Sequence, residues 1–119
     1  MQKLNIRVAN VQAKSGPVSI LILEGDLDAH TSPDLENQVA AILKGPTRRF
    51  LVILKDLKYI SSVGIGTFIG FQQDIKAKSG ELALAAMSDN VKKVFEMSGF
   101  VRLVKVYADE GQAAEFLTR

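Results

Sequence analysis

Residues 50–66 read FLVILKDLKYISSVGIG, and this stretch predicts a strand followed by a helix. The apolar run Phe50–Leu54 is continuous, which is typical of a strand covered on both faces, as central strands of parallel sheets are. Apolar residues at helical spacing follow the two serines, so we expect a helix that begins near Ser62 and ends at Ser79-Gly80. A buried strand leading into an amphipathic helix predicts an α/β fold.

The segments on either side extend this pattern. Residues 4–9 alternate and residues 18–23 are apolar, with a turn-rich stretch between them, so we expect a hairpin. The other expected elements are a helix from Pro33 to a stop at Gly45-Pro46, a strand over Leu82–Ala86, a helix capped by Ser88 or Asp89 and closed by Gly99, a strand over Leu103–Tyr107 and a helix opened by Asp109. The order ββαβαβαβα predicts a mixed, mostly parallel β-sheet with helices, as one domain over residues 1–119.

Composition limits the chemistry of the chain. Its 119 residues include no cysteine and one histidine, His30, which excludes disulfides, thiolate metal sites and multi-histidine metal centres. No apolar run approaches the ~20 residues of a membrane span, and the N-terminus lacks the pattern of a signal peptide, so we expect a cytoplasmic protein without membrane contact. The net charge is +2, and its basic pairs, Arg48-Arg49 and Lys92-Lys93, lack interleaved aromatic residues. We interpret them as solvated surface and expect no direct contact with nucleic acid.

Two loops are candidate sites, because sites in α/β sheets collect where strands end and helices begin. Residues 58–64 read KYISSVG, and the hydroxyl of Ser61 or Ser62 could cap the following helix. A phosphate on one of these serines would add about −1.5 to −2 charges, which the positive end of the helix dipole tolerates. The sequence is therefore compatible with a capping serine, with a phosphorylated serine, or with one serine that has both roles.

The other loop is acidic. Residues 24–31 read EGDLDAHT, and Glu24, Asp26 and Asp28 alternate within them. If this stretch is extended, the three carboxylates point to one face beside His30. The pattern fits either a solvated loop or a contact surface for a basic partner, and it lacks the second histidine expected of a metal site.

A catalytic interpretation has little support in the sequence. A triad of Ser62, His30 and Asp28 is conceivable, but the residues around Ser62 lack the first glycine of the G-x-S-x-G nucleophile elbow. Asp56 follows a central strand as a phospho-accepting aspartate would, yet the paired acids that hold Mg²⁺ in such proteins are missing. We expect Asp56 to be an ordinary loop residue.

Residues 64–70, GIGTFIG, offer a nucleotide-binding alternative. Glycines that open a helix after a strand can admit a pyrophosphate, but this spacing is loose, and Leu84–Met87 provides no acid at the end of the next strand. The alternative is structural, with Gly66 and Gly70 allowing the helix to approach the sheet or a partner closely.

Taken together, three stretches resemble bacterial anti-sigma factor antagonists, the single-domain members of the STAS family. The resemblance covers Asn5 to Leu117 and depends on residues 24–31 (EGDLDAHT), 56–66 (DLKYISSVGIG) and 88–100 (SDNVKKVFEMSGF). It implies the STAS fold and a binding protein, not an enzyme, with no cofactor, no catalytic residues and no metal site.

The resemblance also implies a regulatory cycle. The unphosphorylated chain would bind an anti-sigma factor that is also a serine kinase and release the sigma factor. Phosphorylation on Ser62 would switch binding off, and a serine phosphatase would restore it. Ser61 stands where the family has aspartate, so Ser61 is a second candidate acceptor. The implied partner-binding residues are Asp26, Asp28, His30, Ser61, Ser62, Val63, Gly64 and Gly66. The alternatives are a constitutive STAS scaffold and a nucleotide-binding module without a phosphorylation switch.

Overall fold

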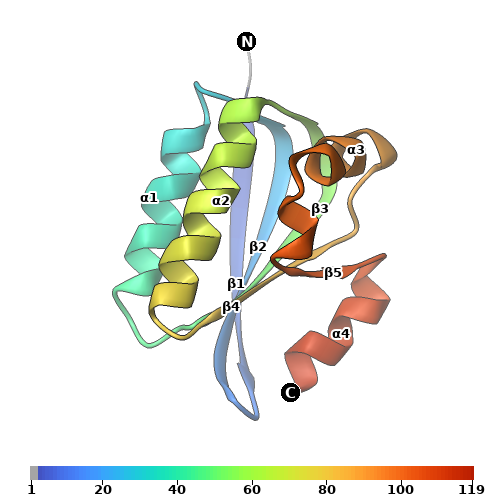
Figure 1. The fold of residues 1–119 in the computed structure, drawn as a ribbon. Coiled ribbons are helices and arrows are strands. Elements are labelled where there is room, and N and C mark those ends of the chain that lie inside the picture. The colour runs from blue at the N-terminus through green and yellow to red at the C-terminus, as the bar shows by residue number, and fades with distance from the viewer. Residues whose placement is uncertain (1–2) are drawn as a thin grey trace.

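The computed structural model describes residues 3–119, and Met1 and Gln2 lie outside the described part. Within that range the elements follow the predicted order ββαβαβαβα, with one added 3₁₀ helix, η1 (Figure 1). The elements are β1 (Leu4–Ala13), β2 (Gly16–Leu27), α1 (Ser32–Leu43), β3 (Arg49–Ile60), α2 (Ser62–Ala77), β4 (Glu81–Ala85), α3 (Asp89–Ser98), η1 (Phe100–Arg102), β5 (Lys105–Tyr107) and α4 (Glu110–Thr118).

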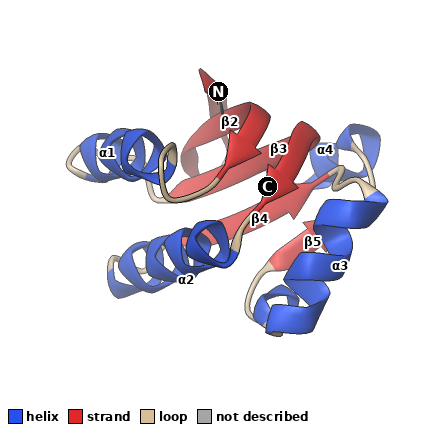
Figure 2. Cartoon of the chain, turned by 90° about the horizontal axis from the view of Figure 1, so that it is seen from above, coloured by secondary structure: helices blue, strands red, loops and turns tan. Residues whose placement is uncertain are grey.

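The strands form one sheet in the order β1-β2-β3-β4-β5. The hairpin strands β1 and β2 are antiparallel, whereas β2–β3, β3–β4 and β4–β5 are parallel pairs. Helices α1, α2 and α3 cover one face of the sheet and α4 covers the other (Figure 2). The mixed, mostly parallel sheet predicted from the sequence is therefore confirmed.

Helix ends follow the sequence signals. Ser88 caps α3, because its Oγ accepts the Val91 N–H at 3.4 Å, and Gly99 ends the helix with φ +76°. Asp109 caps α4 by accepting the Gln112 N–H at 2.7 Å. Side-chain acceptors at these positions satisfy backbone donors that the first helical turn leaves free.

The larger core lies between the sheet and helices α1 to α3, and Phe68 of α2 is at its centre. The Phe68 ring is fully buried, with centroids of the Phe71, Phe95 and Phe100 rings 5.6, 5.3 and 6.2 Å away. These rings come from α2, α3 and η1, so aromatic packing joins α3 and η1 to α2. Among residues 3–119, no helix is long and apolar enough to cross a membrane.

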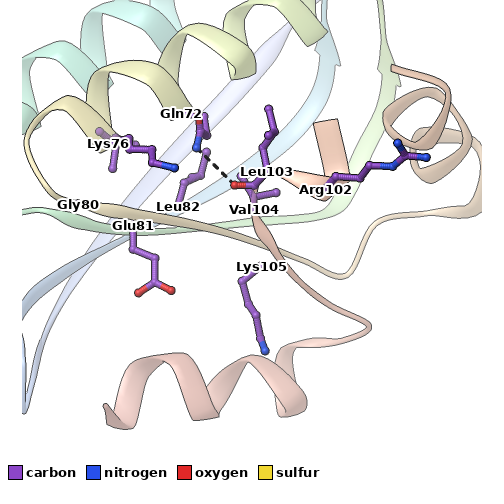
Figure 3. A pocket seen from close by; sticks show the side chains of 10 residues that line it. Gln72, Lys76, Gly80, Glu81, Leu82, Arg102, Leu103, Val104 and Lys105 are labelled. Carbon is purple, nitrogen blue, oxygen red and sulfur yellow. Dashed lines mark hydrogen bonds between the residues drawn. The ribbon is translucent and has the colours of Figure 1, made fainter. Parts of the chain in front are cut away.

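The strands β1, β2 and β3 are longer than predicted from the sequence, and β5 is shorter. β3 continues to Ile60, and Asp56 pairs with Glu24 of β2, so the prediction of Asp56 as a loop residue is wrong. The strand continues because β2 also extends, to Leu27, and supplies backbone partners along this polar stretch. β5 is shorter than predicted: Leu103 follows η1 and is 57% exposed, and the chain enters the sheet only at Lys105 (Figure 3).

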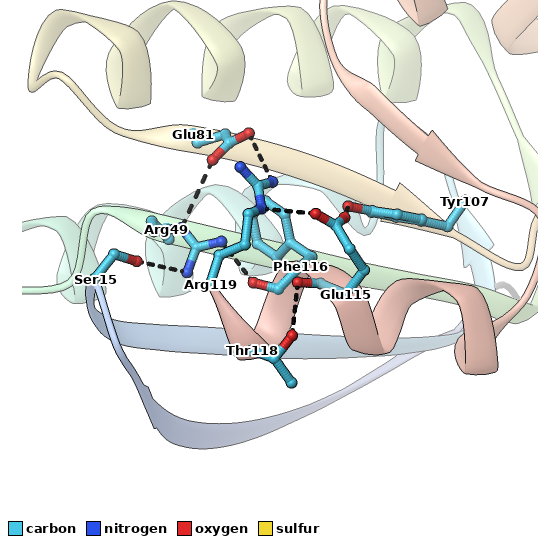
Figure 4. A network of polar contacts seen from close by, with 8 residues as sticks. All are labelled: Ser15, Arg49, Glu81, Tyr107, Glu115, Phe116, Thr118 and Arg119. Carbon is cyan, nitrogen blue, oxygen red and sulfur yellow. Dashed lines mark hydrogen bonds and ion pairs between the residues drawn. The ribbon is translucent and has the colours of Figure 1, made fainter.

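Helix α4 is fixed to the sheet by a polar network around Phe116 (Figure 4). Arg49 donates a hydrogen bond to the Phe116 carbonyl at 2.6 Å, and its guanidinium lies 4.2 Å from the Phe116 ring centroid. Glu81 contacts both Arg49, at 3.6 Å, and Arg119, at 3.3 Å. The interpretation of Arg48-Arg49 as solvated surface is therefore wrong for Arg49, whose side chain is only 11% exposed. Arg48 also has a structural contact, a 2.7 Å hydrogen bond to the Gly45 carbonyl after α1.

The Tyr107 hydroxyl donates a hydrogen bond to Glu115 in the same network. Burial, with the carboxylate neighbour adding to it, raises the pKa of Tyr107. The hydrogen bond from Tyr107, reinforced by the charge of Arg119, lowers the pKa of Glu115. A carboxyl group whose pKa is lower in the folded than in the unfolded state stabilises the fold at pH values above its ordinary pKa. This contribution is lost as the pH falls through the folded pKa.

We therefore predict that Glu115→Gln reduces the dependence of stability on acidic pH. The free energy of unfolding of the unmodified chain should fall more steeply than that of the variant as the pH is lowered through the ordinary titration range of a carboxylate. Urea denaturation followed by circular dichroism measures both curves. Glu96→Gln, at an exposed position in α3, is the control and should retain the wild-type slope. Parallel curves for Glu115→Gln and the unmodified chain would contradict the role of this contact.

Candidate functional site

The two candidate loops meet at the ends of β2 and β3. Leu27 pairs with Ile60 across these strands, and the Ser61 N–H donates to the Leu27 carbonyl at 2.9 Å. Gly64, in the first turn of α2, packs against the same residues. A Cβ at Gly64 would lie 2.8 Å from Ile60 Cγ1 and 2.9 Å from the Leu27 oxygen, so only glycine fits without a shift. The start of α2 is thus held directly against the end of β2.

The two serines of this junction have different environments. Ser61 is the N-cap of α2, in extended conformation (φ −91°, ψ 173°), and its Oγ accepts the Gly64 N–H at 3.2 Å. Ser62 is the first residue of α2, as the sequence predicted, and it is exposed. Within residues 3–119 the Ser62 hydroxyl has no hydrogen-bond partner, whereas that of Ser61 is half-buried and engaged.

The loop between β2 and α1 is organised by its own side chains. Asp28 Oδ1 accepts the N–H groups of His30, at 2.9 Å, and Thr31, at 3.1 Å. The buried Thr31 hydroxyl donates to the Asp26 carbonyl at 2.8 Å. The carboxylate of Asp28 therefore shapes the loop, and the exposed residues at its tip are Ala29 and His30.

Of the three acidic residues, Glu24 and Asp26 lie in β2 and only Asp28 lies in the loop after it, and they do not follow simple alternation. The β2–β3 register shifts between Ile22 and Glu24 and again between Gly25 and Asp26, and Gly25 has φ +112°. A Cβ at Gly25 would lie 2.3 Å from the Lys3 oxygen, so the irregularity depends on glycine. Glu24 accepts a 3.0 Å hydrogen bond from Asn5. In the described part of the chain, no group of three or more His, Cys, Asp or Glu residues is placed to hold a metal ion.

Two exposed apolar side chains flank the serines. Tyr59 is 50% exposed and Val63 is 49% exposed. A small hollow of about 80 Å³ lies beside Tyr59, between the end of β3 and α3. Tyr59 lies in the candidate segment of residues 58–64 but was not among the expected contact residues, because the sequence does not show that its side chain is exposed at the end of β3.

The glycine-rich stretch forms a helix and not a phosphate-binding loop. β3 ends at Ile60 and α2 begins at Ser62, so only Ser61 separates them, and the glycines at 64, 66 and 70 all lie within α2. A Cβ at Gly66 or Gly70 would meet no atom within 4 Å, so neither residue allows a close approach to the sheet. Both line a groove of about 270 Å³ between α1 and α2.

Comparison with known protein families places the whole domain. A family model described as STAS domain matches residues 9–113. The chain belongs to the STAS domain family.

Two relatives are about a third identical to the chain over the residues that align. The "Anti-sigma-B factor antagonist" of Staphylococcus aureus is 32% identical over 91 residues, which cover 76% of this chain and 82% of the relative. The "Anti-sigma F factor antagonist" of Paenibacillus polymyxa is 32% identical over 97 residues, covering 81% and 83%. The solved structure of the anti-sigma factor antagonist SpoIIAA in its unphosphorylated form superposes with a TM-score of 0.78 at 24% identity, over 94% of this chain and 95% of that chain. This last similarity shows the shared fold.

The different roles of the serines predict different effects on stability. Ser61→Ala removes the acceptor of the Gly64 N–H and should lower the free energy of unfolding by about 1 kcal/mol. Ser62→Ala, the matched control one residue away, should change it by less than about 0.5 kcal/mol, because the hydroxyl is exposed and without a partner. Urea denaturation of both variants measures these values. Equal losses, or a larger loss for Ser62→Ala, would contradict the assignment of Ser61 as the cap.

Proposed function

We propose that this STAS domain is an anti-sigma factor antagonist, whose unphosphorylated form binds an anti-sigma factor with serine kinase activity and so releases the sigma factor. The names of the Staphylococcus aureus and Paenibacillus polymyxa relatives support the class. The observation that carries the switch is the exposed Ser62 hydroxyl at the start of α2, which has no partner within residues 3–119. The protein would act in the cytoplasm and need no cofactor of its own.

The proposed binding surface, which we name the signature face, combines both loops with the first turn of α2. It consists of Asp26, Asp28, His30, Tyr59, Ser61, Ser62, Val63, Gly64 and Gly66. Tyr59 and Val63 offer apolar area beside Ser62, and His30 is exposed at the neighbouring loop. Ser61, Gly64 and Asp28 hold the backbone in place through the contacts described above.

Ser62 is the proposed phosphate acceptor. In the transfer, Ser62 Oγ bonds to the γ-phosphorus of the partner's ATP, the hydroxyl proton leaves and ADP remains on the partner. Ser61 is a poorer acceptor, because its Oγ is half-buried and already accepts the Gly64 N–H. A serine phosphatase would hydrolyse the phosphoester and regenerate the free hydroxyl.

A phosphate at Ser62 would change binding without unfolding the domain. The group carries about −1.5 to −2 charges at neutral pH, and free N–H groups and the positive dipole at the start of α2 accommodate it. Tyr59 and Val63, which flank the serines in the sequence, are exposed, and a partner that covers this surface would have to desolvate the phosphate. It would also repel the nucleotide phosphates of a kinase partner, so the modified chain is released.

Phosphorylation assays on two alanine variants test the acceptor. The chain is incubated with its kinase-type anti-sigma factor and ATP, and intact mass is measured. The unmodified chain and Ser61→Ala should each gain one phosphate, and Ser62→Ala should gain none, because it lacks the acceptor oxygen.

The other outcomes each contradict part of this proposal. A phosphate that is lost in Ser61→Ala and retained in Ser62→Ala would move the acceptor to Ser61. No phosphate on any form, with binding to the anti-sigma factor intact, would favour a constitutive scaffold. Stabilisation of the chain by nucleotide alone, in a thermal-shift measurement, would favour the nucleotide-binding alternative.

A further inference from the structure

A hollow of about 400 Å³ lies at the end of α2 opposite Ser62 (Figure 3). It exists because the edge strand β5 does not pair with the whole length of β4. β4 begins at Glu81, but its pairing with β5 begins only at Ala83, opposite Lys105. The outer edge of β4 is therefore without a strand at Glu81 and Leu82. The segment before β5 runs past this gap, and Gln72 of α2 reaches the Leu103 carbonyl across it at 3.4 Å.

The rim of this hollow is positively charged. Lys76, Arg102 and Lys105 line it and are exposed, and within residues 3–119 none of them forms an ion pair. The ammonium of Lys105 lies 5.6 Å from the centroid of the Tyr107 ring. Glu81 also lines the hollow, but its carboxylate is engaged by Arg49 and Arg119 of the α4 network. Lys76 and Arg102 therefore have no neutralising partner within residues 3–119, whereas the side chain of Lys105 points toward α4 (Figure 3), where its charge acts on the carboxylate of Glu115.

The hollow also has an apolar part. Leu103 is 57% exposed, and the lining includes Ile75, Leu82 and Val104. Exposed leucine amid unpaired cations is a combination that an acidic partner with an apolar side chain can cover. The lining residues include no aromatic side chain on which nucleic-acid bases could stack.

We propose that this surface, the basic hollow, binds an acidic segment of a partner protein. Carboxylates of the segment pair with Lys76 and Arg102, and one of its apolar side chains packs on Leu103. Lys76 and Arg102 lie on opposite sides of the hollow and do not converge on one point (Figure 3), so a chain carrying several carboxylates satisfies them better than one compact anion.

The basic hollow is separate from the signature face. Lys76 is fourteen residues after Ser62 in the same helix, which corresponds to about 21 Å at 1.5 Å per residue. Both surfaces can therefore be occupied at once, and a phosphate on Ser62 leaves the basic hollow open. This inference does not depend on the proposed function.

Titration of the full chain with a short fluorescein-labelled peptide of aspartate, glutamate and leucine tests the proposal. Binding should be measurable by anisotropy and should weaken as salt is added. Amide shifts in ¹⁵N spectra should fall on Lys76, Gly80 and residues 102–105. Lys76→Glu combined with Arg102→Glu should weaken binding about tenfold, since two attractions become repulsions. Leu103→Ser should also weaken it.

A matched control separates a site from general electrostatics. Lys14→Glu with Lys92→Glu makes the same change in net charge at exposed positions outside the hollow, and should leave the affinity within about twofold. Circular dichroism verifies that each variant is folded. If the Lys76→Glu, Arg102→Glu variant does not fold, the affinity of Leu103→Ser and the positions of the amide shifts test the proposal.

Four outcomes would overturn the proposal. They are absence of peptide binding, equal weakening by the control variant, shifts confined to the signature face, and tighter binding of a thymidine oligonucleotide than of the peptide at the same residues.

Discussion

The Leu27 carbonyl accepts the Ser61 N–H at 2.9 Å, and Gly64 packs against the same carbonyl, so the start of α2 and the end of β2 form one unit. This contact requires that β2 and β3 both extend to their pairing at Leu27 and Ile60. It also requires a residue without a side chain at position 64. The position of Ser62 beside the acidic loop follows from these two conditions, although the loops are more than thirty residues apart in the sequence.

Two adjacent residues at this contact have different structural environments. Ser61 is used by the fold, because its N–H and its Oγ both form hydrogen bonds. Ser62 is left free on the surface, at a helix end that accommodates negative charge. A chemical change at Ser62 can therefore alter the surface and leave the domain intact. The α4 network and the basic hollow lie away from this point, so contacts there can form independently of the proposed switch.

The sequence predicted the order of the elements because apolar periodicity and capping residues are local signals. It also identified the two segments that meet in the structure, but the prediction of both as loops is wrong in part, since residues 24–27 lie in β2, residues 58–60 in β3 and residues 62–64 in α2. It could not predict the length of β3, because residues 55–60 are largely polar and are held in the sheet by pairing with β2, including Asp56 with Glu24. The exposure of Tyr59 at the end of this strand was not predicted either. The cap could not be assigned between Ser61 and Ser62, since either hydroxyl suits a helix start. The role of Arg49 depends on Phe116, 67 residues away in the chain.

The affinity of the kinase-type anti-sigma factor for the chain, measured by isothermal titration calorimetry with and without a phosphate on Ser62, tests the central claim most directly. The account predicts that the phosphate weakens binding by about a hundredfold or more, roughly 2.7 kcal/mol. It also predicts that the phosphorylated chain keeps its circular dichroism spectrum and its cooperative unfolding. Equal affinity of the folded, phosphorylated chain, or a loss of binding that accompanies unfolding of the domain, would contradict the account.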